Sequence, residues 1–126
     1  MTIRPRRSML YMPGSNARAL EKAKTVPADA VILDLEDSVA PDAKAAARTQ
    51  IVQTVQGGGF GHREVIVRTN ATDTPWFSDD LDAAVAAKPD AVLVPKISTP
   101  DQIELIGQRL FDLHADQHIT VGDLRY

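Results

Sequence analysis

The chain of 126 residues is 44% hydrophobic and 25% charged, the usual balance of a soluble globular protein with a modest core. Its 14 Lys and Arg residues against 17 Asp and Glu give a net charge of −3, which argues against a nucleic-acid partner. The absence of cysteine excludes disulfides and thiolate metal sites. The sequence has no run of ~18 apolar residues and no apolar segment behind the charged N-terminus. We therefore expect a cytoplasmic chain with no membrane span or signal peptide.

The first predicted unit is a strand, a turn and a helix. Residues Ser8 to Met12 favour a short strand, and Pro13 to Asn16 are turn formers. A helix is expected from about Asn16 to Thr25. An unbroken apolar run then predicts a strand from Ala30 to Leu35, of the kind that is buried on both faces of a parallel sheet.

A second helix and a third strand follow. Pro41 suits the first turn of the helix, because a residue at that position needs no hydrogen-bonded N–H. The apolar residues of this helix recur every four positions, at Ala47, Ile51 and Val55, and Gly57 to Gly59 end it. Residues Glu64 to Thr69 are rich in β-branched side chains and predict the third strand.

The remaining elements complete four strand–helix units and begin a fifth. Ser78 is the expected N-cap of a third helix. A fourth strand covers Asp90 to Pro95, and Thr99 to Gln102 resembles a capping box before the next helix. The predicted apolar stripe of that helix is Ile103, Ile106 and Leu110. Residues His118 to Val121 read as the start of a fifth strand.

Units in this order place helices against a parallel sheet, either a complete open sheet or part of a barrel. The carboxyl ends of the strands then lie along one rim, where such proteins carry their chemistry. Four segments reach that rim: Tyr11 to Asn16, Asp34 to Asp37, Arg68 to Asn70, and Pro95 with Lys96. Acidic and basic residues from four strands in one place predict a site for an anionic substrate.

Each charged residue of the rim has a structural interpretation beside the functional one. Arg68 can hold a substrate carboxylate bidentately or form an internal ion pair with Glu36, and the two are compatible. Glu36 and Asp37 can brace cations, bind a metal through water or cap the next helix. Lys96 can contact an anion or remain solvated.

Four ordered segments resemble the HpcH/HpaI aldolase and citrate lyase family, in its citrate lyase β-subunit-like and malyl-CoA lyase-like branch. They read RRSMLYMPGSNARALEKA, AVILDLEDSVAPDAKAAAR, IVRTNATDTPW and AVLVPKI. The resemblance implies the N-terminal half of a TIM (β/α)8 barrel, about four β-α units and the start of a fifth strand, with residues 1–126 as a single partial domain. It also implies a lyase that cleaves or forms a carbon–carbon bond in citryl-CoA, malyl-CoA or a similar 3-hydroxyacyl-CoA, which gives an acyl-CoA and a 2-oxoacid.

The resemblance also implies site residues. The carboxylate-binding arginine of the family corresponds to Arg68, with Asn70 beside it. Glu36 and Asp37 fall in a segment that lines the substrate site, and Lys96 keeps its position there.

The first loop of the family helps to bind coenzyme A. That role falls on Pro13, Gly14, Ser15 and Asn16, with Arg18 just behind them. On the residues alone, such a turn can present backbone N–H groups to a phosphate at the start of a helix.

Family members use Mg²⁺ to polarise the 2-oxoacid carbonyl and form homotrimers or hexamers. Their metal-binding Glu and Asp follow the fifth and sixth strands, and a catalytic Asp comes from a neighbouring subunit. We therefore expect no metal ligand and no catalytic residue in this chain, which would make it a truncated or frameshifted product or a fragment with little or no lyase activity by itself. A half barrel would leave two strand edges and the inner strand faces uncovered, so we also expect the chain to associate.

Two alternatives remain. The first is a receiver-like signalling module, in which Asp34 or Asp37 would accept a phosphoryl group and Pro95-Lys96 would supply the late lysine. The first strand lacks the acidic pair that such a module needs. The second is a chain that binds CoA or pairs with another subunit without catalysis.

Overall fold

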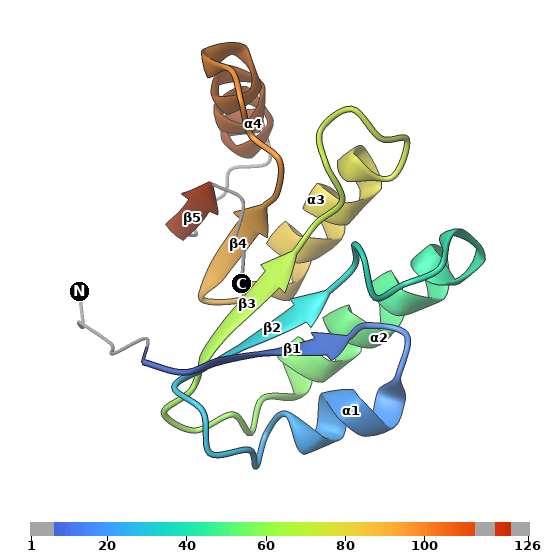
Figure 1. The fold of residues 1–126 in the computed structure, drawn as a ribbon, viewed down its shortest axis with the longest axis vertical. Helices are drawn as coiled ribbons and strands as arrows, with labels where there is room; N and C mark the ends of the chain where they lie inside the picture. The colour runs from blue at the N-terminus through green and yellow to red at the C-terminus, as the bar shows by residue number, and fades with distance from the viewer. Residues whose placement is uncertain (1–6, 113–117, 122–126) are drawn as a thin grey trace.

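The computed structural model describes residues 7–112 and 118–121, and five strands alternate with helices along them (Figure 1). The elements are β1 (Met9–Pro13), α1 (Ala17–Lys22), β2 (Ala30–Asp34), the 3-10 turn η1 (Pro41–Ala43), α2 (Lys44–Gly57), β3 (Glu64–Arg68), α3 (Phe77–Ala87), β4 (Ala91–Val94), α4 (Pro100–Asp112) and β5 (His118–Val121). Every strand predicted from the sequence is present, and each of its ends lies within one residue of the prediction.

The sheet is entirely parallel, and its strands follow the order β1-β2-β3-β4-β5. Each strand pairs with the next one in the chain, which is the arrangement of a TIM-type barrel. Receiver domains share a different order, 2-1-3-4-5. The observed order therefore argues against the receiver-like alternative.

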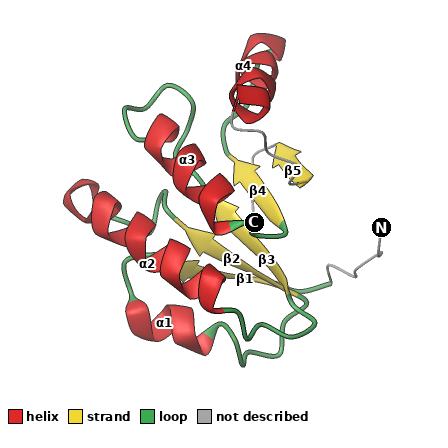
Figure 2. Cartoon of the chain, turned by 180° about the vertical axis from the view of Figure 1, so that it is seen from behind, coloured by secondary structure: helices red, strands yellow, loops and turns green. Residues whose placement is uncertain are grey.

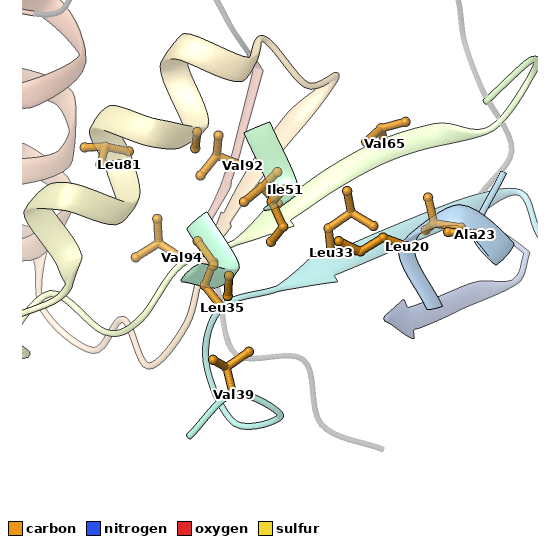
Figure 3. Packing of buried hydrophobic residues seen from close by; sticks show 14 of the residues in the cluster. Leu20, Ala23, Leu33, Leu35, Val39, Ile51, Val65, Leu81, Val92 and Val94 are labelled. Atoms are coloured by element: carbon orange, nitrogen blue, oxygen red, sulfur yellow. The ribbon is translucent and has the colours of Figure 1, made fainter. Parts of the chain in front are cut away.

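Helices α1, α2 and α3 pack on one face of the sheet, and the main core lies between them and the strands (Figure 2). The strands supply alternate residues to this core, including Leu33, Val65 and Val92, while Ile51 and Leu81 come from α2 and α3 (Figure 3). The fully buried Ile51 and Ala47 confirm the stripe predicted for the second helix.

The opposite face of the sheet is also packed, which corrects the expectation of uncovered inner strand faces. Ile32, Ile66 and Leu93 are at most 2% exposed and form a second cluster with Tyr11 and Met9 at its edge. The register places these side chains next to one another, since Tyr11 pairs with Ile32, and Ile32 with Ile66.

Two local predictions were wrong and one was confirmed. Ser78 is not an N-cap: α3 already begins at Phe77, and the flanking Trp76 makes no side-chain capping bond. Ile103, predicted to lie on the apolar stripe of α4, is 52% exposed, and Ile106 is the buried residue of this helix. Gln102 Oε1 accepts a hydrogen bond from the Thr99 N–H at 3.1 Å, as the capping box predicts.

Within the described residues, no helix is both long enough and apolar enough to cross a membrane.

Candidate functional site

The carboxyl rim carries a bidentate ion pair between β2 and β3. Asp34 and Arg68 are register partners, so their side chains leave neighbouring strands at the same level. Both continue the alternation of the inner-face residues Ile32 and Ile66. Arg68 Nε donates to Asp34 Oδ1 at 2.7 Å and Nη2 donates to Oδ2 at 2.8 Å. Asp34 is 1% exposed, so the pair is shielded from water.

Asp34 also holds the loop that follows β2. Its carboxylate accepts hydrogen bonds from the Glu36 N–H at 2.9 Å, the Ser38 N–H at 3.1 Å and the Ser38 hydroxyl at 2.6 Å. Burial raises the pKa of the Asp34 carboxyl, but the hydrogen bonds from Arg68, Ser38 and Glu36 outweigh it, so the pKa is lowered overall. Asp34 is therefore a fixed anion that orients Arg68.

Arg68 is held on two further sides. Its guanidinium lies over the Tyr11 ring, 4.5 Å from the ring centroid, which places an aromatic surface beneath the charge. Burial opposes the charge of Arg68, but Asp34 favours it more strongly, so the pKa of Arg68 is raised. The predicted ion pair with Glu36 is present at 3.4 Å, yet Asp34 is the nearer carboxylate.

Glu36 bridges two cations from different strands. Its Oε1 lies 3.4 Å from Arg68 Nη1, and its Oε2 lies 3.1 Å from Lys96 Nζ. Lys96 follows β4 and has a left-handed backbone with φ of 58°, which is uncommon for a non-glycine residue. The Glu36 side chain is 7% exposed and that of Lys96 is 58% exposed, so the bridge spans the surface of the rim.

Asn70 is a predicted site residue whose side chain is used inside the protein. Its Nδ2 donates to the Leu35 carbonyl at 2.9 Å and to Asp80 Oδ2 at 2.6 Å. Its Oδ1 accepts from Lys44 Nζ at 2.8 Å. Asp80 in turn accepts from Arg48 Nε at 2.7 Å. In this structure Asn70 links β2, α2 and α3 beneath the rim.

Lys44 is the clearest residue of this region that sequence reasoning missed. It is buried, and its ammonium donates to the Leu35 and Glu36 carbonyls at 2.9 and 3.1 Å as well as to Asn70. The Trp76 ring centroid lies 4.9 Å from Nζ. Burial lowers the pKa of Lys44, partly offset by Asp80 and other carboxylates. The sequence contains a sign that Lys44 is buried, since Lys44 precedes the buried Ala47 by three residues and so lies on the same helix face.

A cavity of about 420 Å³ opens at the rim, within the range of small-molecule sites. It brings together four of the predicted site residues, Glu36, Asp37, Asn70 and Lys96. The remaining lining residues are Val39, Pro41, Lys44, Ala71, Asp73, Thr74 and Trp76. Asp37 is exposed there, while Trp76 and its apolar neighbours provide a surface for the uncharged part of a ligand.

The loop between β1 and α1 lies against the end of β2. Gly14 N–H donates to the Asp34 carbonyl at 2.8 Å. A Cβ at Gly14 would lie 2.7 Å from that carbonyl oxygen and 2.6 Å from Ile51 Cδ1, so the close approach requires glycine. Asn16 caps α1 by accepting the Ala19 N–H at 3.1 Å, and Arg18 is exposed. The predicted CoA-binding loop is thus adjacent to the ion pair.

The described residues do not fit a magnesium ion. They contain no group of three or more His, Asp or Glu side chains placed to hold a metal. Asp34 and Glu36 are already neutralised by Arg68 and Lys96. The cations in this part of the rim are suited to binding an anion.

The sequential parallel sheet with its polar carboxyl rim defines the chain as part of a TIM-type barrel. The chain belongs to the HpcH/HpaI aldolase/citrate lyase family, whose sequence pattern matches residues 7–125. The family predicted from the four motifs is therefore confirmed.

Known relatives and a solved structure agree with this assignment. A (3S)-malyl-CoA thioesterase of Cereibacter sphaeroides strain KD131 is 49% identical over 109 residues, which are 86% of this chain and 38% of that protein. The citrate lyase subunit beta of Escherichia coli K12 is 42% identical over 100 residues, 79% of this chain and 33% of that protein. The protein CitE of Mycobacterium tuberculosis, solved with magnesium, acetoacetate and coenzyme A, is 29% identical with a TM-score of 0.71 and is matched over 93% of this chain and 40% of its own. The chain thus spans well under half of each relative.

Proposed function

We propose that this chain forms the carboxylate- and CoA-binding part of a lyase that acts on 3-hydroxyacyl-CoA substrates of the citryl-CoA or malyl-CoA type. The observation that carries the proposal is the position of Arg68 at the end of β3, where Asp34 fixes its orientation. Membership of a family that contains citrate lyase and malyl-CoA enzymes supports the reaction class.

Arg68 would hold a carboxylate of the 2-oxoacid product. Asp34 binds the edge formed by Nε and Nη2, so a ligand would approach the edge formed by the two terminal nitrogens, where Nη1 also lies 3.4 Å from Glu36 Oε1. The Tyr11 ring beneath the guanidinium limits its tilt. Because Arg68 is oriented before the ligand arrives, little conformational entropy is lost on binding.

The loop from Pro13 to Asn16, together with Arg18, would bind part of CoA. Gly14 contacts the backbone of Asp34, so a CoA held by this loop would lie beside the Asp34–Arg68 pair. Magnesium, which the CitE complex contains, would polarise the oxoacid carbonyl in a complete site. Its ligands would come from outside the described residues, and a homotrimer or hexamer would form the complete enzyme.

The proposal is tested by ligand binding. Isothermal titration with oxaloacetate and with CoA should show binding to the wild-type chain, and Arg68→Lys should weaken oxaloacetate at least about tenfold because lysine cannot replace the planar fork. Arg109→Lys is the matched control, since Arg109 of α4 pairs with Asp82 of α3 and neither residue lines the cavity. An equal loss in both variants, or none in Arg68→Lys, would refute the role of Arg68.

The same samples separate binding from catalysis. They would be assayed for cleavage of malyl-CoA and citryl-CoA with Mg²⁺. Robust turnover that is lost in Arg68→Ala would show that the chain is a lyase in its own right. Retention on a CoA column without turnover would identify a CoA-binding chain that needs a partner subunit.

A further inference from the structure

We propose that Glu36 is a built-in competitor for the anion-binding position between Arg68 and Lys96, and that it thereby determines which carboxylates the site accepts. The inference rests on the proposed function in one respect: it takes the ligand carboxylate to bind at Arg68. It adds a residue that opposes binding and so sets its selectivity.

The position of the Glu36 carboxylate is the first observation. Its two oxygens face two different cations, with Oε1 at 3.4 Å from Arg68 Nη1 and Oε2 at 3.1 Å from Lys96 Nζ. A ligand carboxylate that used both cations would need the same place. Glu36 thus mimics the ligand within the chain itself.

The pairing of the rim cations is the second observation. Arg68 has Asp34 and Glu36 as partners, and Lys96 has Glu36. Lys44 directs its ammonium to three oxygens beneath the cavity. A ligand anion that binds Arg68 and Lys96 must therefore displace Glu36 from them, and the like charges of ligand and Glu36 would repel each other if both stayed.

Glu36 is the carboxylate that a ligand can displace. Asp34 accepts five hydrogen bonds and is bound bidentately at 2.7 and 2.8 Å. Glu36 makes longer contacts, and one of its partners, Lys96, is 58% exposed and can follow a ligand outward. Displacement of Glu36 costs two ion pairs at the rim, whereas displacement of Asp34 would also release the loop through Ser38.

This arrangement selects among carboxylates. A simple monocarboxylate would make only the contacts with Arg68 and Lys96 that Glu36 already makes, so it would displace Glu36 poorly. A ligand with further contacts in the cavity, such as a dicarboxylate or an oxoacid attached to a larger group, can displace Glu36. The site would therefore reject small metabolic acids while accepting larger substrates.

The test compares Glu36→Gln with Asp42→Asn. The two variants remove the same charge, but Asp42 is exposed in η1 and lies outside the cavity lining. Pyruvate, a small 2-oxoacid monocarboxylate, is titrated into each protein while the Arg68 Nε–H signal is followed by NMR, with Arg68→Lys used to assign it. We expect Glu36→Gln to tighten pyruvate binding at least about tenfold, about 1.4 kcal/mol, and Asp42→Asn to change it less than about threefold.

Each outcome is decisive. Weaker binding in Glu36→Gln, the same affinity in both variants, or no binding in either would overturn the proposal, because removal of a competing carboxylate must strengthen the attraction between the rim cations and the ligand. Adding Lys96→Met to Glu36→Gln should reverse most of the gain, and a gain that persists would show that Lys96 takes no part. A chain that binds pyruvate more tightly as Glu36→Gln but never binds CoA would disprove the proposed function and leave this inference standing.

Discussion

Replacement of Asp34 by asparagine tests the ion pair on which the rim depends. The change removes the charge that Arg68 needs, and the side chains of Arg68 and Asp34 are only 13% and 1% exposed. Loss of one partner of a buried pair costs about 3–5 kcal/mol, because the other charge stays buried without compensation. Glu36 remains 3.4 Å from Arg68 and offsets part of this loss, so we expect a decrease of about 3 kcal/mol in the free energy of unfolding.

Urea unfolding provides the measurement. The chain has a single tryptophan, Trp76, so fluorescence and circular dichroism report independently on the same transition. Asp42→Asn is the control, because an exposed substitution of this kind changes stability by less than about 0.5 kcal/mol. A loss below about 1 kcal/mol in Asp34→Asn would refute the view that the pair is buried and strong.

The same variant predicts a pH dependence. The folded-state pKa of Asp34 is lowered, so the native chain binds fewer protons at this group than the unfolded chain does. The stabilisation is complete above the unfolded pKa of about 3.9 and is lost as the pH falls through the lowered folded value. The difference between wild type and Asp34→Asn should therefore be constant near neutral pH and shrink in acid. A difference that stays constant below about pH 3 would contradict the assignment.

Four further predictions concern separate parts of the structure. Lys44→Met should lower stability by about 2–3 kcal/mol in urea unfolding, because Asn70 Oδ1 loses its donor and the Leu35 and Glu36 carbonyls each lose one of two donors. Lys96→Gly should be about 1 kcal/mol more stable than Lys96→Ala, since only glycine relieves the left-handed backbone, and equal midpoints would argue against strain there. Gly14→Ala should cost about 1–3 kcal/mol by the same measurement because the methyl group would contact a backbone carbonyl. Phe111, 75% exposed on α4, should promote association, so Phe111→Ser should lower the mass seen by light scattering without altering stability by more than about 0.5 kcal/mol, and an unchanged mass would count against this.

The strands and the rim could be predicted from the sequence because both depend on local patterns. Apolar runs such as Ala30 to Asp34 identify buried strands, and the residues that follow them must meet at one edge of a parallel sheet. The motifs then identified the family, whose fold the strand order shares.

The pairing within the rim could not be predicted in the same way. Nothing in a single sequence shows that Asp34 and Arg68 are register partners, since a shift of the register would have placed another residue opposite Arg68. Glu36 was expected as the main partner because only its position after the strand was considered. Its actual role as a bridge also involves Lys96, whose left-handed backbone the sequence does not reveal.

The buried charges beneath the rim were overlooked for a different reason. Lys44 and Asp80 occur in helices, where charged residues are usually exposed. Helical spacing nevertheless places each on a buried face, Lys44 with Ala47 and Asp80 with Ala84. Charge on an otherwise apolar helix face is thus a signal for a buried polar network.

The sequential strand order has a consequence for how the chain folds. Met9 pairs with Ala30, Ala30 with Glu64, and Ile66 with Ala91, so each pairing joins segments separated by a single helical connection. A single helical crossover is about the shortest connection that parallel strands allow, so the entropy cost of closing each loop is low for a parallel sheet. Neighbouring strand–helix units can therefore form one after another, and the Asp34–Arg68 pair is made as soon as the second and third units meet.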